Sequence, residues 1–204
     1  MLILTALEVL RLIVGAEEAM NKVREQYTHR ENVAYNNGRT EEYEVVRVNG
    51  KAFRRLVARQ GKPLPDKERA VVLRAMRRFA RGLTVPTRIY TMRFGEIRKL
   101  ESTHDLSIED NKLLARPREG NPYLHRLHFD PDTHRLHIHA VEVTGPGSEL
   151  SPGTVARLYY NSEGFLEKLI IDFQIGKRRG RQMHIHSGYR KFDAASTITF
   201  EDIP

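Results

Sequence analysis

Hydrophobic positions along the chain change period near residue 30, from helical spacing to alternation. Before that point apolar residues recur every three or four positions, at Ile3, Leu7, Leu10, Val14, Met20 and Val23. This spacing predicts an N-terminal helix that continues to about His29. Residues 41–48 and 51–58 instead alternate, with Asn49-Gly50 between them. Asn-Gly between two alternating runs predicts a hairpin with a type I′ turn, because both turn positions need positive φ.

A second helix is predicted over residues 66–81, with Asp66 as its N-cap and Gly82 as its stop. One stripe of this helix is apolar and indicates core packing: Val72, Ala75, Met76 and Phe79. Its polar side carries four arginines at the same spacing: Arg74, Arg77, Arg78 and Arg81. These four residues are the candidate site for an anionic surface.

From residue 88 onward the sequence alternates between strands and turns. Strands are predicted at residues 88–94, 123–129, 135–144, 155–160, 165–175 and 182–189, with a last short strand near Ile198 and Phe200. Residues 100–122 are polar and are expected to be irregular. Successive hairpins of this kind indicate a closed or strongly curved antiparallel meander. The predicted fold class is therefore α+β, with the N-terminal helix and the second amphipathic helix packed against a strongly curved antiparallel sheet.

The first 16 residues permit two interpretations. The run is too short and too charged for a membrane span, because Glu8 and Arg11 lie inside it. Val14-Gly15-Ala16 offers small residues at the cleavage positions of an export signal, although no Lys or Arg precedes the run. Residues 1–16 are thus either an eroded signal peptide or the first half of a packed helix. Residues 17–204 are expected to form a single domain.

The charge is concentrated in one part of the chain. The 204 residues carry a net charge of +8, yet residues 51–82 alone carry +9. Such a segment suits an anionic partner, such as phospholipid headgroups, nucleic acid or an acidic protein; the alternative is a solvated face that only aids solubility. The chain has no Cys, which excludes disulfides, zinc-thiolate sites, cysteine nucleophiles and the lipid-bearing Cys of a lipoprotein.

Catalytic motifs are absent from the sequence. There is no Gly-x-Ser-x-Gly elbow, no Gly-x-Gly-x-x-Gly and no P-loop, so we expect neither an enzyme nor a cofactor. Two His-x-His pairs, His137/His139 and His184/His186, could form a four-imidazole metal site if their strands were neighbours. We expect instead that they are solvated outward positions, and that there is no metal site. The basic run at residues 176–181 could bind phosphate, but is expected to be an exposed hairpin tip.

Three segments carry a resemblance to a known family. They are EEYEVVRVNGKAFRRLVARQGKPL at residues 41–64, Tyr27-Thr28-His29-Arg30-Glu31, and Ser187-Gly188-Tyr189-Arg190-Lys191-Phe192. They resemble segments of secreted bacterial proteins described as uncharacterised or outer-membrane lipoprotein-sorting-like. The resemblance implies a fold similar to that of the periplasmic lipoprotein carriers, in which a curved antiparallel sheet wraps over helices and encloses an apolar cavity for acyl chains. It implies no catalytic residues.

Three functions follow as hypotheses. The first is a non-enzymatic cell-envelope protein that binds a lipid or an acylated protein in an apolar cavity, with its basic helix on an anionic membrane surface. Its location would be periplasmic or secreted, or cytoplasmic if residues 1–16 are not a signal. The second is a nucleic-acid-binding module that uses the four arginines and residues 177–181. The third, a His-based metalloenzyme, has the least support.

Overall fold

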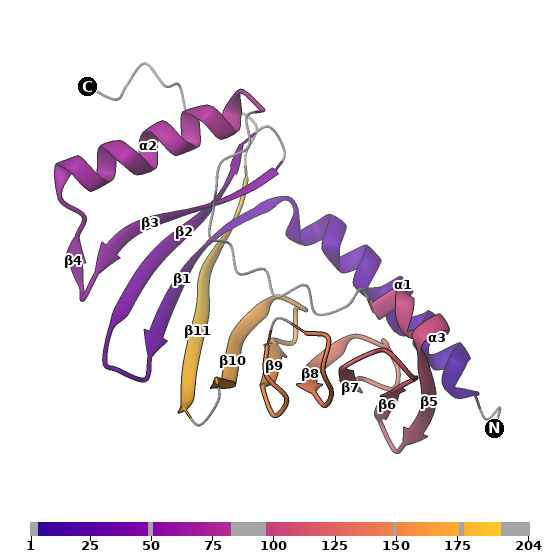
Figure 1. Ribbon diagram of the computed structural model, residues 1–204. Helices are drawn as coiled ribbons and strands as arrows, with labels where there is room; N and C mark the ends of the chain where they lie inside the picture. Colours follow the sequence, from indigo (N-terminus) through magenta and orange to yellow (C-terminus); the bar gives the residue numbers. More distant parts are fainter. Residues whose placement is uncertain (1–3, 49–50, 83–96, 149, 176–177, 193–204) are drawn as a thin grey trace.

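The computed structural model describes residues 4–48, 51–82, 97–148, 150–175 and 178–192 (Figure 1). Within these residues the chain forms three α-helices, α1 (Ala6–Arg24), α2 (Asp66–Ala80) and α3 (Leu100–Thr103), and a 3-10 turn, η1 (Ile97–Lys99). None of the described helices is long and apolar enough to cross a membrane.

Eleven strands among the described residues form one antiparallel sheet. They are β1 (Tyr27–Tyr35), β2 (Thr40–Val48), β3 (Lys51–Arg59), β4 (Lys62–Pro63), β5 (His104–Glu109), β6 (Lys112–Pro117), β7 (Tyr123–Phe129), β8 (Leu136–Val143), β9 (Val155–Tyr160), β10 (Leu166–Ile175) and β11 (Arg178–Lys191). Their spatial order is β4-β3-β2-β1-β11-β10-β9-β8-β7-β6-β5, and the sheet is open. The α+β class and the curved antiparallel sheet are confirmed; the sheet curls around α1 (Figure 1).

Helix α1 begins where a capping box fixes its first turn. The Thr5 hydroxyl accepts from the Glu8 backbone N–H at 3.3 Å, and the Glu8 carboxylate accepts from the Thr5 backbone N–H at 2.7 Å. The helix buries Val9, Leu10 and Ile13 against strands β6–β8. The predicted boundary between a signal peptide (residues 1–16) and the domain (residues 17–204) therefore falls inside one continuous helix. The predicted continuation to His29 is wrong, because α1 ends at Arg24 and residues 27–35 form strand β1.

Three predicted hairpins are confirmed. Strands β2 and β3 pair so that Arg47 faces Ala52 across the turn, while residues 49–50 themselves lie outside the described residues. Strands β7 and β8, and strands β9 and β10, pair as expected. The predicted strands at residues 88–94 and near residues 198–200 also lie outside the described residues.

Two local predictions need correction. Residues 100–122 are not irregular, since they contain α3, β5 and β6, with Asp110 at φ 52° in the β5–β6 turn. The N-cap of α2 is Pro65, with no side-chain cap, and Asp66 is the first residue of the helix. Gly82 does end α2 in the expected way: its φ is 74° and its N–H donates to the Phe79 carbonyl.

The strand register places α1 and α2 on opposite faces of the sheet. Residues opposite each other in antiparallel strands share a face, and one such row runs across the sheet: Leu127, His139, Leu158, Leu169, His184 and Val33. Leu127 packs under α1, so we call this side the α1 face. Side chains alternate between the two faces along each strand, and Val46 and Phe53 fall on the face opposite to this row. They pack under α2, so we call this side the α2 face.

Candidate functional site

The four arginines predicted as the anionic-surface site lie on the solvent side of α2. Arg74, Arg77, Arg78 and Arg81 are all exposed, and none forms an ion pair with any other described residue. The first half of the helix differs, because Arg69 pairs with Asp66, and Arg59 of β3 pairs with Glu68. Lys67 forms no ion pair with a described residue either, but Asp66 and Glu68 balance the charges of Lys67 and Arg69, so the net positive charge of α2 lies in its second half.

The core beneath α2 explains why these guanidinium groups face outward. Met76 is 1% exposed and packs with Val46 and Phe53 of the hairpin below. The Phe53 and Phe79 rings lie 5.2 Å apart. At about 100° per residue, Arg74, Arg78 and Arg81 lie about 140–160° from Met76 around the helix axis, and Arg77 lies about 100° from it, so the four arginines point away from the core. Packing of the apolar stripe thus fixes the arginine row toward solvent.

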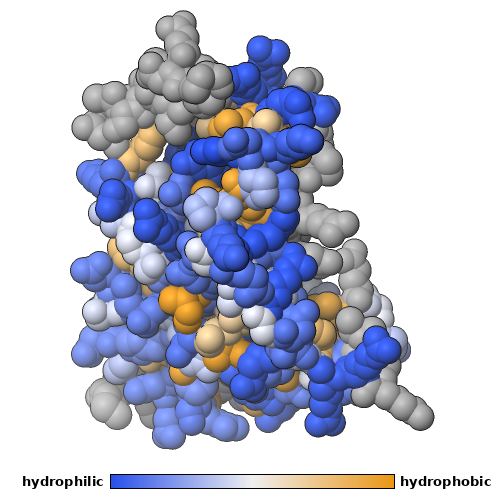
Figure 2. Space-filling model, turned by 90° about the vertical axis from the view of Figure 1, so that its left-hand side faces the viewer, coloured by the Kyte–Doolittle hydropathy of each residue, from blue (hydrophilic) through white to orange (hydrophobic). Residues whose placement is uncertain are grey.

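An apolar cleft opens between α2 and the strands β3 and β4. Its volume is about 220 Å³. Side chains of both elements line it: Leu56, Val57, Pro63 and Leu64 from the sheet, and Val72 and Leu73 from the helix, with Arg55 and Arg69 also contributing. The surrounding surface is mainly hydrophilic, with apolar side chains showing in small patches (Figure 2). The sequence pattern identified Val72 only as core and gave no sign of this cleft.

The α1 face of strands β1–β3 carries charges where an apolar cavity was expected. Glu31 is 5% exposed, and its carboxylate accepts from Arg54 Nε at 2.5 Å and pairs with His184 Nδ1 at 2.6 Å. Burial alone would raise the pKa of Glu31, but the hydrogen bonds from His184 and Arg54 outweigh it and lower this pKa to about 2. Within the described residues, this half of the sheet is therefore built around a buried ion cluster.

A second buried carboxylate extends the same cluster. Glu41 accepts hydrogen bonds from the hydroxyls of Tyr35 at 2.8 Å and Tyr43 at 2.6 Å, and it also pairs with Arg39. The Arg54 guanidinium lies 3.3 Å from the centroid of the Tyr43 ring. These contacts join the two carboxylates into one network, which further fills the face.

The histidines do not gather as the sequence permitted. Strand β8 carries His137 and His139, and β11 carries His184 and His186, but β9 and β10 lie between them. The expectation that all four point to solvent is wrong for His139 and His184, which are 3% and 9% exposed, and for the half-buried His186, whose Nδ1 lies 3.2 Å from Nε2 of His29. His139 Nε2 instead lies 3.0 Å from Nδ1 of His125 on the adjacent strand. No group of three metal-ligating side chains occurs among the described residues.

The basic run near residue 180 is mostly strand. Residues 178–181 belong to β11, and residues 176–177 lie outside the described residues. Arg181 donates to Asp172 at 2.6 Å, and Arg157 donates to the same carboxylate group at 2.8 Å. Arg181 is therefore compensated within the sheet, unlike the four arginines in the second half of α2.

Comparisons with known proteins give weak matches only. No protein-family model and no curated protein sequence matches the chain. A solved structure of the Pseudomonas aeruginosa MucA/MucB complex matches with a TM-score of 0.29 and 11% identity, over 89% of this chain and 99% of that one. A structure of MucB in complex with MucA(peri) matches with a TM-score of 0.28 and 11% identity, over 88% and 99%. Likeness at this level identifies neither a family nor a function, and the resemblance drawn from the sequence segments stays a prediction.

Proposed function

We propose that this chain is a non-enzymatic, exported cell-envelope protein that binds an anionic amphiphile, either a lipid or an acylated protein, at α2. One observation carries the proposal: the same helix presents a row of uncompensated arginines to solvent and covers an apolar cleft on its inner side. An amphiphile has both complementary parts, an anionic headgroup and an acyl chain.

The cleft supplies the apolar part of this recognition. Its wall consists mainly of aliphatic side chains of β3, β4 and α2. Each methylene group transferred there from water contributes about 0.8 kcal/mol. An acyl chain would enter at the α2 face, away from the charged network of Glu31 and Glu41 on the α1 face.

The arginine row supplies the electrostatic part. A basic side chain close to an anionic membrane contributes about 1 kcal/mol at modest salt. Four such residues would change partition on the order of hundreds-fold, and salt would screen the effect. Nucleic acid would also attract these charges, but the cleft beside them has no role in binding a phosphodiester backbone.

Vesicle co-sedimentation tests the proposal. The wild type and an Arg74/Arg77/Arg78/Arg81→Gln variant are compared on neutral and anionic phospholipid vesicles at low and high salt. A control variant loses the same charge from exposed positions away from α2: Lys22, Lys112, Arg116 and Arg135→Gln. We expect the wild type and the control to bind anionic vesicles at low salt, and the α2 variant to lose most of this binding.

Equal binding by all three proteins would overturn the role of α2. Retention of the wild type on single-stranded DNA or heparin, without binding to vesicles, would favour the nucleic-acid function instead. The apolar part has its own test, because a Leu73→Asp substitution places a charge in the cleft while the arginine row is kept. We expect this variant to bind anionic vesicles but to lose discrimination between long-chain and short-chain lipids.

A further inference from the structure

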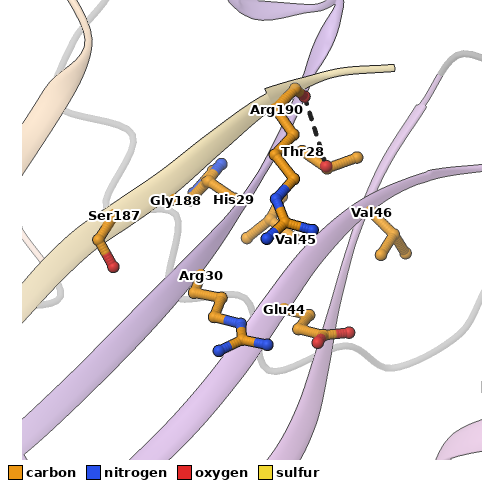
Figure 3. A pocket seen from close by; sticks show the side chains of 9 residues that line it. All are labelled: Thr28, His29, Arg30, Glu44, Val45, Val46, Ser187, Gly188 and Arg190. Carbon is orange, nitrogen blue, oxygen red and sulfur yellow. Dashed lines mark hydrogen bonds between the residues drawn. The ribbon is translucent and has the colours of Figure 1, made fainter. Parts of the chain in front are cut away.

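The three segments that carried the sequence resemblance meet at a single pocket. Residues 27–31 lie in β1, residues 187–191 lie in β11, and the two pair so that Thr28 faces Arg190 and Arg30 faces Ser187. Glu44 of the third segment faces Arg30 from β2. Together these strands enclose a pocket of about 310 Å³ on the α2 face (Figure 3).

A β-bulge in β11 shapes this pocket. Between Ser187 and Arg190 the strand advances three residues while β1 advances two, and Gly188 has φ 62°. A Cβ built on Gly188 would meet nothing within 4 Å, so the bulge borders open space. The bulge changes the direction of β11 locally, and the Arg190 side chain extends across β1 toward β2; the Arg30 side chain, from β1, points toward Glu44 of β2 (Figure 3).

The pocket has an excess of positive charge. Arg30 and Arg190 are exposed, and neither forms an ion pair with another described residue. Glu44, the acidic residue in the lining, is already bound by Arg55, whose Nη2 and Nε lie 2.5 Å and 2.9 Å from its carboxylate. His29 adds no charge to the pocket, because its ring lies on the α1 face, with its centroid 4.8 Å from that of Tyr189, and burial lowers its pKa to about 4. Two guanidinium groups therefore have no anion of their own.

We propose that this pocket binds a phosphate group through Arg30 of β1 and Arg190 of β11, with Ser187 also in its lining. One arginine is enough to bind a planar carboxylate, because two of its N–H groups donate in parallel to the two carboxylate oxygens. Two guanidinium groups that come from different strands suit a tetrahedral phosphate group, whose oxygens accept from several directions.

This site is distinct from the surface of the proposed function. None of its lining residues belongs to the arginine row of α2. Val46 lines the pocket and also packs under α2, so the two sites are neighbours on the α2 face. A phosphate bound here is either a free phosphate compound or the headgroup of a lipid gathered by the helix, and the two sources can be separated by experiment.

Titration calorimetry at low ionic strength tests the site with inorganic phosphate as the probe. We expect saturable binding to the wild type and at least a ten-fold loss of affinity in an Arg30/Arg190→Gln variant. The matched control, Arg135/Arg179→Gln, removes the same charge from exposed positions outside the pocket and should keep the wild-type affinity. Unfolding midpoints of all three proteins establish that the substituted positions leave the fold intact, and Arg30/Arg190→Lys, which keeps the charge, should retain part of the affinity.

Two results would overturn the proposal: no saturable phosphate binding by the wild type, or equal affinity in the two Gln variants. Acetate at the same ionic strength should bind more weakly than phosphate, and equal binding would replace the phosphate assignment with a general anion site. Phosphatidylglycerol vesicles that compete for the site would identify a lipid headgroup as the source, and vesicles without effect would identify a soluble phosphate compound. The vesicle assay on α2 is independent of these outcomes, because its variant leaves Arg30 and Arg190 in place.

Discussion

Gly180 lies opposite Phe173 in the β10–β11 pair, on the α1 face. A Cβ at this position would lie 2.6 Å from Cε2 of the Phe173 ring, and the ring is too stiff to bend away. We expect Gly180→Ala to lower the free energy of unfolding by about 1–3 kcal/mol through overpacking. Chemical denaturation measures the loss. A Gly180→Ala/Phe173→Leu double variant should recover part of it, and no recovery would show that the ring is not the cause.

Glu31 and Arg54 form the buried pair at the centre of the ion cluster, with side chains 6% and 18% exposed. Removing one charge from such a pair leaves the other buried without compensation. We therefore expect Glu31→Gln to destabilise the protein by about 3 kcal/mol. Glu42→Gln removes an exposed carboxylate on the adjacent strand and is expected to change stability by less than about 0.5 kcal/mol. Equal effects of the two substitutions in urea denaturation would contradict the importance of the pair.

Single residues show what sequence patterns can and cannot predict. The exposure of Arg74 and its neighbours follows from helical spacing alone, and the structure agrees. The burial of His139 and His184 does not follow, because it depends on partners in other strands, His125 and Glu31. The pocket around Arg30 and Arg190 was also out of reach, since 160 residues separate these positions in the sequence.

Helix α1 is an integral part of the core at the scale of elements. Ile13 is fully buried, whereas its neighbour Leu12 is 43% exposed. We expect Ile13→Ala to cost about 2–5 kcal/mol of stability, and Leu12→Ala to cost less than about 0.5 kcal/mol. Thermal denaturation of the two variants makes a matched comparison. Similar melting temperatures would mean that the first half of α1 does not pack as described, as expected of a cleaved signal.

Hairpins were predictable from sequence because their turns carry strong local signals. Three turn sequences predicted that the chain reverses direction, and the pairing of the flanking strands confirms each one: Asn49-Gly50, residues 130–133 and residues 161–164. Strand β1 was missed because its inward position at Glu31 is charged, which reverses the expected polarity. Strands β5 and β6 were missed because their short apolar alternation, for example Leu106 and Ile108, is diluted by polar residues. Tertiary partners, rather than local propensity, determine these three strands.

Acid sensitivity is a property of the whole molecule, because buried histidines occur in both halves of the sheet. Burial lowers the pKa to about 4 for His29, His139 and His186 and to about 3 for His125. In the unfolded chain these groups take up protons near pH 6.5, so the unfolded state binds more protons between pH 6.5 and 4. Stability is therefore full above pH 6.5 and falls as the pH drops toward 4. Each histidine contributes up to about 1.4 kcal/mol per pH unit.

Urea midpoints between pH 8 and pH 4.5 measure this dependence. A His125→Leu/His139→Leu variant removes two of the buried groups and should flatten the profile. His137→Gln changes an exposed imidazole on the same strand and should leave the profile unchanged. A wild-type midpoint that stays constant from pH 7 to pH 5 would contradict the prediction.

The pairing of β1 with β11 sets the order in which the chain can complete its fold. Strands β1–β4 come from the first 63 residues, and β5–β10 come from residues 104–175, yet the two groups join in the sheet through β11. A nascent chain cannot make this junction until residue 191 has left the ribosome. Contacts between segments so distant in sequence also close slowly, because the entropy of a long loop is lost before the contacts form. The two halves of the sheet thus stay unjoined until β11 is available, in a state that an export machinery, a chaperone or a protease can engage before the native sheet exists.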